Sequence, residues 1–389
     1  MVHQILASHL VGGAAAVALR LAASARARGI ACVGWVPGIG PASEALDAAA
    51  IPRRTYDLAA MRQGRWRQLV ACARMMPGLI GTGRPVVHVH NPIVYRLLYP
   101  ALRAAGARTV VHVQIEPAPG ELEWALRFPP DHVVACARYI ARRIERTMSP
   151  IAPALRVTAV PNAIDVTEFS SASGSRPAPM RARGRVVVLM LANLAPHKGQ
   201  ATALRAVHRL RQQGVQAECW LAGEDRAAAG YERELRALAA ALGLDGVRFL
   251  GFRSDTQELL RAADVLLLPS TREGLPLAVL EAQAAGVPVV ASPLPGILEA
   301  VADGITGVIV PADDDEGYAR AILRLIADND LRGRIVEAAR ASVAREYGWA
   351  AFEQRIFDIY RSLSAASARG TCRQPGGTPA RVSGTGTSA

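Results

Sequence analysis

The sequence predicts an α/β protein with one doubly wound parallel sheet in each half of the chain. First, short apolar runs alternate with helical patterns along most of the 389 residues, which is typical of parallel strands joined by crossover helices. Second, this length favours two domains over one. Third, residues 171–184 are rich in Ser, Gly, Pro and Arg, which predicts a surface linker between a domain at 1–170 and another at 185–347.

The first domain opens with a strand, a glycine turn and a helix. Residues 3–8 read HQILAS, and Gly12 and Gly13 precede a helical pattern that continues to Arg28. The glycine pair fits a tight turn, and it equally fits a close approach of backbone N–H groups to a phosphate at a helix N-terminus. Further strands are predicted at 30–35, 86–90 and 109–115.

The second domain repeats the alternation of strand and helix. Its strands are predicted at 186–191, 217–221, 247–250, 265–268, 289–291 and 308–310. Its helices are predicted at 199–213, 231–242, 254–262, 276–285, 316–326 and 330–346. A last helix is expected at 348–364 and could cross back to the first domain. Residues 365–389 have the composition of a disordered tail.

Composition narrows the class of protein. The formal net charge is +12, and Lys198 is the only lysine among the 45 basic residues. The charge fits an anionic partner, but no signature of a nucleic-acid module is present, so nucleic acid is not an expected partner. The five cysteines show no paired spacing, which favours a reducing cytoplasm over a disulfide framework or a zinc site. The sequence has no uncharged apolar run of 18 residues, so no transmembrane helix is predicted.

Two further stretches each allow two interpretations. Residues 61–80 mix arginines with Trp66 and aliphatic side chains at helical spacing, as in a packed surface helix or in a helix that binds an anionic membrane. His88 and His90 alternate along the strand at 86–90 and face the same side. They could bind a metal, but without an evident third ligand we expect structural histidines and no metal site.

The stretch from 264 to 288 carries the clearest functional signal. Residues 264–268 read DVLLL and predict a buried strand that leads into a loop and then into the helix at 276–285. Glu281 is the only charge in that apolar helix, and Glu273 lies in the loop before it. Glu281 could pair with an arginine in the core, and Glu273 could be a solvated loop residue. Both could also face a cleft at the carboxyl end of the strand, where open α/β sheets bind ligands.

The stretch EGLPLAVLE resembles the E-x7-E motif of retaining glycosyltransferases of family 4, which have the GT-B fold. LPSTREG, EAQAAGVPVVAS and DGITGVIVP resemble neighbouring motifs of that family, as do LANLAPHKG and PNAID. The resemblance covers roughly residues 3–362. It implies two Rossmann-like domains that face a central cleft. It also implies a hexosyltransferase that takes a sugar from a UDP- or GDP-linked donor, with retention of configuration. No metal is expected, because the candidate carboxylates have other assignments and residues 313–315 are expected in a surface turn away from the cleft.

The resemblance also implies roles for charged and polar residues. Lys198 matches the diphosphate-binding lysine of the family, and Asn193 stands where the family often has arginine. Glu273 would hold hydroxyls of the donor sugar, and Glu281 would hold the ribose hydroxyls. The remaining donor-binding positions that it implies are Gly12, Gly13, Gln114, Gly223, Phe252, Gly274 and Leu275. Gln114 replaces the usual histidine and could still bond a hydroxyl group.

The expected acceptor is a glycan, a lipid-linked sugar or a small molecule, and no cofactor is expected beyond the nucleotide sugar. A cytoplasmic location is expected, and the basic helix at 61–80 would allow peripheral attachment to the inner face of the plasma membrane. Two other functions remain open at this point. One is a nucleotide-sugar epimerase or hydrolase of the same fold. The other is a non-catalytic subunit of glycan assembly, which Asn193 and Gln114 favour.

Overall fold

The computed structural model describes residues 1–80, 84–170, 184–225 and 230–369. Of the linker predicted at 171–184, all but Gly184 lies outside the described residues. The same holds for residues 370–389 of the predicted tail.

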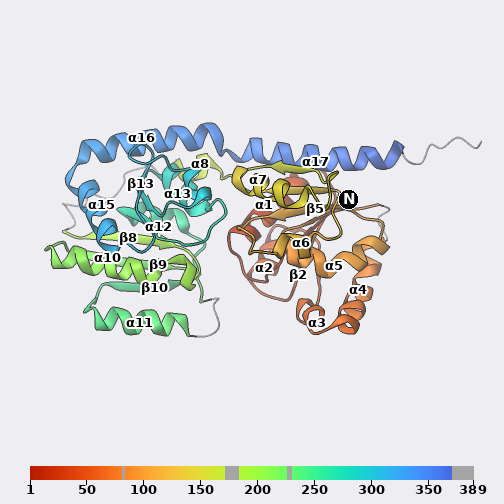
Figure 1. Ribbon diagram of the computed structural model, residues 1–389, viewed down its shortest axis with the longest axis horizontal. Helices are drawn as coiled ribbons and strands as arrows, with labels where there is room; N and C mark the ends of the chain where they lie inside the picture. The colour runs from red at the N-terminus through yellow and green to blue at the C-terminus, as the bar shows by residue number, and fades with distance from the viewer. Residues whose placement is uncertain (81–83, 171–183, 226–229, 370–389) are drawn as a thin grey trace, which may run out of the picture.

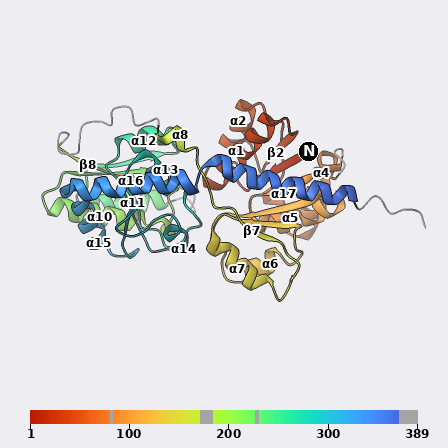
Figure 2. The same cartoon turned by 90° about the horizontal axis from the view of Figure 1, so that it is seen from above.

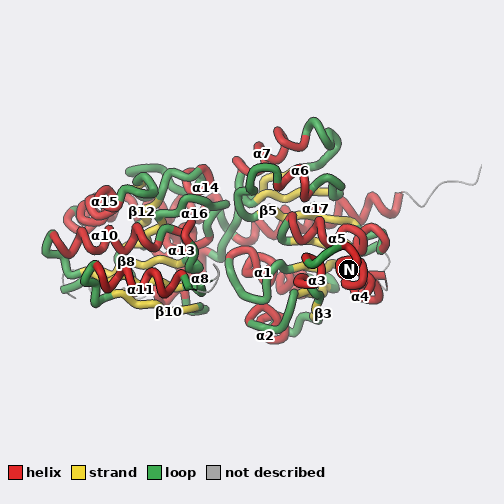
Figure 3. The backbone as a smooth tube through the Cα atoms, turned by 60° about the horizontal axis from the view of Figure 1, so that its bottom comes forward, coloured by secondary structure: helices red, strands yellow, loops and turns green. Residues whose placement is uncertain are grey.

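Two parallel sheets lie side by side, each between helices (Figures 1 and 3). The first has the strand order β3-β2-β1-β4-β5-β6-β7, and the second has the order β10-β9-β8-β11-β12-β13. In both sheets the order reverses at the first strand, as in a doubly wound fold. The predicted fold class of two doubly wound domains is therefore confirmed.

The strands are short and mostly buried. Those of the first sheet are β1 Val2–Ile5, β2 Cys32–Val36, β3 Arg53–Thr55, β4 Val86–Val89, β5 Arg108–Val113, β6 His132–Ala135 and β7 Val157–Ala159. Those of the second are β8 Val186–Leu191, β9 Ala217–Ala222, β10 Val247–Gly251, β11 Val265–Leu268, β12 Val289–Ala291 and β13 Val308–Ile309.

Helices connect the strands of each sheet. In the first half they are α1 Gly13–Ala27, α2 Pro41–Ala48, α3 Leu58–Arg62, α4 Arg65–Ile80, α5 Pro92–Ala104, α6 Glu121–Ala125, α7 Arg138–Met148 and α8 Val166–Ser170. In the second half they are the 3₁₀ turn η2 Pro196–Lys198, α10 Gln200–Gln212, α11 Tyr231–Ala241, α12 Thr256–Ala262, α13 Leu277–Ala285, α14 Pro295–Leu298, α15 Asp315–Ala327, α16 Asn329–Glu346 and α17 Trp349–Arg369.

In each sheet the loops beside the point of reversal lie at the carboxyl ends of the strands. β1 pairs in parallel with β2 on one side and β4 on the other, and α1 begins soon after its carboxyl end. β8 likewise lies between β9 and β11. Loops that leave such neighbouring strands in opposite directions open a crevice at their carboxyl ends. The crevice of the second sheet is therefore formed by η2 and by the loop at 269–276 after β11.

The final helix, α17, packs on the first sheet although it follows the second sheet in sequence (Figures 1 and 2). Its buried side chains share one core with β1 and α1, and they are Phe352, Ile356, Phe357, Ile359, Tyr360 and Leu363. The Trp349 indole N–H donates to Ser24 Oγ of α1 at 3.2 Å. The helix continues to Arg369, so the prediction of a disordered tail from residue 365 is wrong for residues 365–369.

The single helix predicted at 61–80 is also wrong, because the structure has two helices there. α3 ends at Arg62 and α4 begins at Arg65. Between them Gly64 has a φ of +121°, a backbone conformation that other residues rarely adopt. The apolar spacing continues across this break, so periodicity alone does not reveal it.

Candidate active site at the junction of the two sheets

Lys198 and Glu273 form an ion pair at the crevice of the second sheet. Lys198 Nζ lies 2.8 Å from Glu273 Oε1 and 2.9 Å from Oε2, and Ser270 Oγ–H donates to Oε1 at 2.8 Å. The Glu273 side chain is 6% exposed and that of Lys198 is 18% exposed. Three hydrogen bonds in a nearly dry site hold the carboxylate in one orientation. Such an orientation suits a group that must receive hydroxyls at fixed positions.

The backbone brings the two loops of this pair together. The Thr271 N–H donates to the His197 carbonyl at 2.8 Å, which ties the loop after β11 to η2. Gly199 follows Lys198 with a φ of +77°, and a Cβ on it would lie 2.1 Å from the Pro269 carbonyl oxygen. Only glycine allows both this conformation and this contact. The local sequence HKG therefore places Lys198 beside Glu273.

The first half of the chain encloses the loop that carries Glu273. A Cβ on Gly274 would lie 2.4 Å from the Gln114 carbonyl oxygen and 2.9 Å from Cys136 Sγ. Asn162 Nδ2–H donates to the Leu275 carbonyl at 2.8 Å, and the Tyr139 hydroxyl donates to the Glu273 carbonyl at 2.5 Å. The predicted positions Gly274 and Leu275 thus lie where the two sheets meet.

A second contact joins the two halves next to this loop. The Glu299 carboxylate, at the end of α14, accepts the backbone N–H groups of Arg138 at 2.9 Å and Tyr139 at 2.6 Å. These groups belong to the first turn of α7, where N–H groups lack partners within the helix. A carboxylate there also interacts favourably with the helix dipole. We call Tyr139, Asn162 and Glu299 the loop clamp.

The glycine turn of the first sheet reaches the same junction. A Cβ on Gly13 would lie 3.7 Å from Leu277 Cδ1, at the first turn of α13. Gln114 Nε2 lies 3.5 Å from the Ala14 carbonyl oxygen in α1. Two helices, α1 and α13, therefore begin beside the Glu273 loop. Helix N-termini carry partial positive charge and free N–H groups, so this junction suits an anion such as a diphosphate.

Glu281 lines a separate cavity of about 150 Å³ at the same junction. Burial, with a smaller contribution from Glu168, raises the pKa of its carboxyl to about 7, and Arg20 acts in the opposite direction. Arg20 lines the cavity too, but its ion pairs go to Asp165 at 2.8 Å and Glu168 at 3.2 Å. The core pairing with arginine considered for Glu281 is thus not among the ion pairs of the described residues.

Other lining residues of this cavity were not singled out by sequence reasoning. They include Arg20, Ser254, Thr256, Gln257 and Trp349. Arg20 carries the one charge within the run AVALRLAA, which is the signal that could have marked it. The others come from segments distant in sequence and carry no motif of their own.

The remaining predicted positions lie at different distances from this centre. A Cβ on Gly223 would lie 2.8 Å from Asn193 Cα, so these two residues pack together beside β8. The Asn193 carbonyl accepts a hydrogen bond from Gln200 at 2.9 Å. Phe252 follows β10, is 39% exposed and is not among the residues that line the Glu281 cavity. The Gly223 N–H nevertheless donates to the carbonyl of Gly251, the residue before Phe252, at 2.8 Å.

His88 and His90 are joined by a third histidine, His112. Ring nitrogens of all three lie within 4.8 Å of one another, and all three side chains are buried. The rings of His88 and His112 are nearly parallel, with 12° between their planes and 5.3 Å between centroids. An imidazole lone pair lies in the ring plane, so stacked rings do not aim their lone pairs at one ion. Both nitrogens of His90 already have hydrogen-bond partners. This arrangement suits structural histidines better than a metal site.

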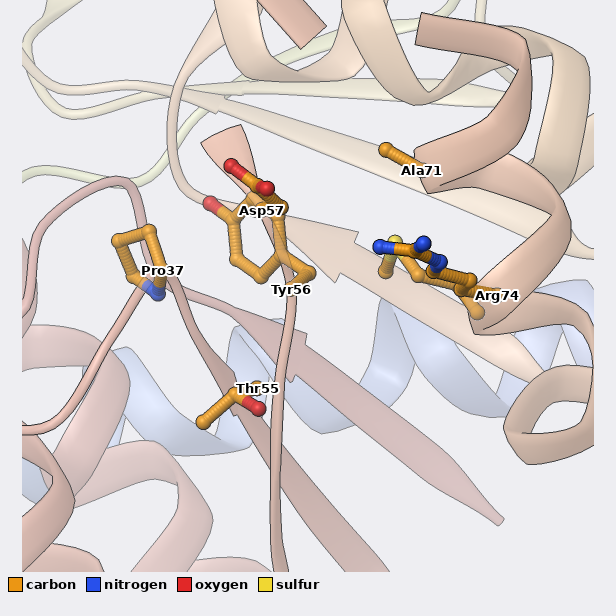
Figure 4. Close-up of a pocket in the computed structure, with 7 residues that line it drawn as sticks. Pro37, Thr55, Tyr56, Asp57, Ala71 and Arg74 are labelled. Carbon is orange, nitrogen blue, oxygen red and sulfur yellow. The ribbon is translucent and has the colours of Figure 1, made fainter. Parts of the chain in front are cut away.

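A larger cavity of about 330 Å³ lies in the first half, beyond the carboxyl ends of β2 and β3 (Figure 4). Its lining residues are Pro37, Thr55, Tyr56, Asp57, Ala71, Arg74 and Met75. Arg74 of α4 and Asp57 supply opposite charges across it. All strands of this sheet are parallel, so their carboxyl ends point the same way. The cavity therefore lies at the same end of the sheet as Gln114 and the glycine turn.

Two family models match the chain, one over each half. The model described as Glycosyltransferase Family 4 matches residues 11–168, and the model described as Glycosyl transferases group 1 matches residues 175–342. A phosphatidyl-myo-inositol mannosyltransferase of Mycolicibacterium smegmatis is 31% identical over 288 residues, which cover 72% of each chain. A lipopolysaccharide core biosynthesis glycosyltransferase, LpsE of Rhizobium meliloti, is 37% identical over 182 residues. That match spans only half of the Rhizobium protein and 46% of this chain.

Solved structures share the whole fold. Anabaena HepE in complex with UDP-glucose superposes with a TM-score of 0.80 at 21% identity, over 93% of this chain and 99% of HepE. WaaG, described as a glycosyltransferase of lipopolysaccharide biosynthesis, superposes with a TM-score of 0.72 at 18% identity, over 92% and 99%. At such identities the likeness establishes the two-sheet architecture.

Proposed function

Because this chain belongs to the group 1 glycosyl transferases of glycosyltransferase family 4, and is therefore a transferase enzyme, we propose that it transfers a sugar from a nucleotide diphosphate to an acceptor hydroxyl with retention of configuration. The observation that carries the proposal is the buried Lys198–Glu273 pair beside the first turns of α1 and α13. It combines a cation and helix N-termini for a diphosphate with a fixed carboxylate for sugar hydroxyls.

The donor would extend from the Glu281 cavity to this pair. Ionised Glu281 would accept the vicinal ribose hydroxyls. An ammonium has three hydrogens, of which Glu273 takes two, so Lys198 retains one for the diphosphate. The HepE structures are described in complex with UDP, UDP-glucose, and UDP with glucose, which supports a UDP-sugar as the first donor to test.

In the proposed reaction the bond between C1 of the sugar and the diphosphate oxygen breaks, and its electron pair goes to that oxygen. Lys198 and the N–H groups at the start of α13 would stabilise the developing negative charge. The acceptor oxygen bonds to C1 on the face that the diphosphate leaves, and its proton passes to the departing diphosphate oxygen. Asn193 contributes a neutral side chain where an arginine would add a charge, and no metal is invoked.

The acceptor would bind against the first half of the chain. The cavity beyond β2 and β3 offers Asp57 for hydroxyls and Arg74 for an anionic group (Figure 4). The relative from Mycolicibacterium is named for a phospholipid acceptor, and LpsE is named for lipopolysaccharide core, so a glycolipid or lipid-linked acceptor is the class we propose.

Exposed side chains on α4 support a membrane-bound acceptor. Trp66 is 82% exposed, and Leu69, Val70 and Ile80 are also exposed on the same helix. Arg65, Arg67 and Arg74 lie among them. Such a helix can bind an anionic bilayer while the enzyme remains peripheral. Among the described residues no helix has both the length and the apolar character to cross a bilayer. We propose peripheral attachment to the inner face of the plasma membrane.

The test measures free nucleotide released from UDP-, GDP- and ADP-sugars, with and without lipid extracts as acceptor. Release that depends on acceptor, with sugar appearing in the lipid, supports the transferase. Release that is equal without acceptor indicates a hydrolase. A nucleotide-induced thermal shift without any release indicates a binding subunit, and either of these last two results overturns the proposal. A ligand at 100 times its dissociation constant should add about 2.7 kcal/mol of apparent stability.

A further inference from the structure

A chain of buried hydrogen bonds runs from the junction of the sheets into the core of the first half. Gln114 Nε2 lies 3.0 Å from His90 Nδ1, and His90 Nε2 lies 2.7 Å from Gln4 Oε1. Gln4 Nε2 lies 3.0 Å from the Tyr360 hydroxyl, which lies 2.6 Å from His88 Nδ1. Tyr360 belongs to α17, so the last helix of the chain takes part in this network.

The Ala14 carbonyl fixes the donor and the acceptor of every hydrogen bond in this network. The end of the Gln114 carboxamide that faces His90 also lies 3.5 Å from the Ala14 carbonyl oxygen. A carboxamide oxygen there would face that carbonyl with like partial charge, so the NH₂ group must occupy this position. Gln114 therefore donates to His90 Nδ1, which makes His90 the tautomer with its hydrogen on Nε2.

The remaining bonds follow in sequence. His90 Nε2–H donates to Gln4 Oε1, the Gln4 amide donates to the Tyr360 oxygen, and the Tyr360 hydroxyl donates to His88 Nδ1. Burial lowers the pKa of His90 and of His88 well below its usual range, and the neighbouring histidines lower it further. Both rings thus stay neutral near pH 7, so protonation does not reverse the direction of these hydrogen bonds.

The consequence appears at Gln114, where this network reaches the junction of the two sheets. Gln114 Oε1 is buried and has no hydrogen-bond partner among the described residues. A buried acceptor without a partner is costly, so it is a position where a ligand hydrogen would be favourable. Gln114 also lies beside the loop that carries Glu273, since its backbone oxygen nearly touches Gly274.

We infer that His90, Gln4 and Tyr360 are positioning residues that hold the Gln114 carboxamide with its oxygen free, so that this oxygen accepts the hydrogen of one hydroxyl group of the transferred sugar. The inference rests on the proposed function and deepens it. It requires a free hydroxyl at one position of the sugar, because a deoxy or deoxyfluoro sugar has no hydrogen to donate there. It also separates Gln114, which contacts the sugar, from three residues that act through it.

The experiment compares dissociation constants for UDP-glucose and UDP, measured by calorimetry on the full chain. UDP lacks the sugar, so the ratio of the two constants isolates the sugar contact. Gln114→Met keeps the side-chain length and removes both polar atoms. It should lower the preference for UDP-glucose over UDP about 3- to 10-fold, as expected for one neutral hydrogen bond, and leave UDP affinity unchanged.

A double-mutant cycle tests whether His90 acts through Gln114. His90→Phe keeps a ring in the stack but accepts no hydrogen bond, so it should lower the same ratio, and the double variant should be no worse than Gln114→Met. Gln114→His should retain the ratio, because one ring nitrogen can donate to His90 while the other accepts from the sugar. The matched control is His112→Phe, since His112 lies in the same stack but its ring nitrogens bond to no described residue.

Tyr360→Phe provides a milder probe should His90→Phe fail to fold. It removes only the hydroxyl that links Gln4 to His88, and it should reduce the ratio by a smaller factor. An unchanged ratio in Gln114→Met, or additive losses in the double variant, would overturn the inference while UDP binding persists. Failure of the wild-type chain to bind UDP or any other nucleotide diphosphate would instead overturn the proposed function and the inference with it.

Discussion

The two sides of the junction present polar groups in different ways. The side from the second sheet is charged, with Lys198 and Glu273 in contact and Glu281 in a cavity nearby. Where it faces the Glu273 loop, the side from the first sheet presents neutral groups, Gln114 and a histidine, His90, whose pKa is depressed by burial. In the proposed reaction the second sheet would thus supply Lys198 for the diphosphate and carboxylates for hydroxyl groups, and the first sheet would add a neutral acceptor for one more hydroxyl.

The two sides also obtain their order differently. The charged loop is held by contacts from both halves, including the loop clamp of Tyr139, Asn162 and Glu299. The neutral side is held within the core of the first sheet. Tyr360 of α17 reaches that core from the end of the chain. The geometry at Glu273 therefore depends on how the halves meet, while the geometry at Gln114 depends on the seating of α17.

Removing α17 should have the largest effect and should act on the first half. Six apolar or aromatic side chains of α17 are buried, and burial of each contributes about 2 kcal/mol, roughly 10 kcal/mol together. Whole domains are stable by only about 5–15 kcal/mol. A chain that ends at Tyr347 should thus aggregate, while a chain that ends at Arg369 should fold. Equal yields of soluble, cooperatively melting protein from both would contradict this assignment.

The buried groups of the two sides should change the stability in opposite directions when the pH is lowered. Buried His88, His90 and His112 have lowered pKa values, about 3 for His112, so the unfolded chain binds protons that the folded chain does not. Stability should fall as pH drops below about 6.5, by about 1.4 kcal/mol per pH unit for each histidine. Glu281, with its pKa raised from 4.5 to about 7, acts in the opposite direction, and its stabilisation is lost as pH rises between these two values.

Urea unfolding at pH 5, 6 and 7 measures this balance. Three histidines against one carboxyl predict a net loss of about 3 kcal/mol between pH 6 and 5 from these groups. His112→Phe should reduce the slope by one histidine, and Glu281→Gln should increase it. Stability that is independent of pH in this range would mean that the histidines take up protons in the folded state.

Glu273→Gln tests the charged side directly. It keeps the shape of the side chain but weakens the hydrogen bonds to Lys198 and those that the proposed reaction assigns to sugar hydroxyls. Turnover of the donor should fall on the order of 10²-fold or more, while UDP still binds. Ser270→Ala is the matched control, because it removes one hydrogen bond to the same carboxylate and keeps its charge. Wild-type turnover in Glu273→Gln would show that the carboxylate has only a structural role.

Lys198→Ala should have the smallest of these effects, and it should be specific for phosphate. We expect UDP to bind on the order of 10-fold more weakly, with uridine affinity unchanged. Of the bound nucleotide, the ammonium would contact only the diphosphate. Excess EDTA should leave turnover intact. If EDTA abolished turnover and Mg²⁺ restored it, a metal ion would supply part of the positive charge at the diphosphate. Asn193→Arg would then show whether an added side-chain cation replaces the metal.

The same contrast explains what the sequence could predict. In the second half, strand, loop and helix follow one another within a few residues, so the positions of Glu273 and Glu281 at one sheet edge follow from local pattern. The contact of Lys198 with Glu273 was not predicted, because it depends on the close approach of Gly199 to Pro269. Phe252 stays a prediction: it is exposed after β10, next to Gly251, whose carbonyl accepts from the Gly223 N–H.

In the first half the contacts around the candidate site are long-range. Tyr360 meets Gln4 and His88 across most of the length of the chain, and no periodicity indicates that pairing. Arg20 meets Asp165 and Glu168 in the same way. The histidines were correctly placed on one face of their strand, but their third member, His112, comes from a neighbouring strand. Sequence pattern specifies the elements here, and tertiary packing specifies which side chains meet.

The return of α17 also has a consequence for synthesis. The last strand of the first sheet ends at Ala159, yet Leu363 of α17 completes the core of that sheet. About 200 residues separate them, so at roughly 5–20 residues per second the ribosome needs on the order of 10–40 s to supply the missing helix. During that interval the nascent first domain exposes the apolar groove that α17 will fill. Chaperone demand in the cell should therefore concentrate on this half, and slower translation of the second half should lengthen the exposure.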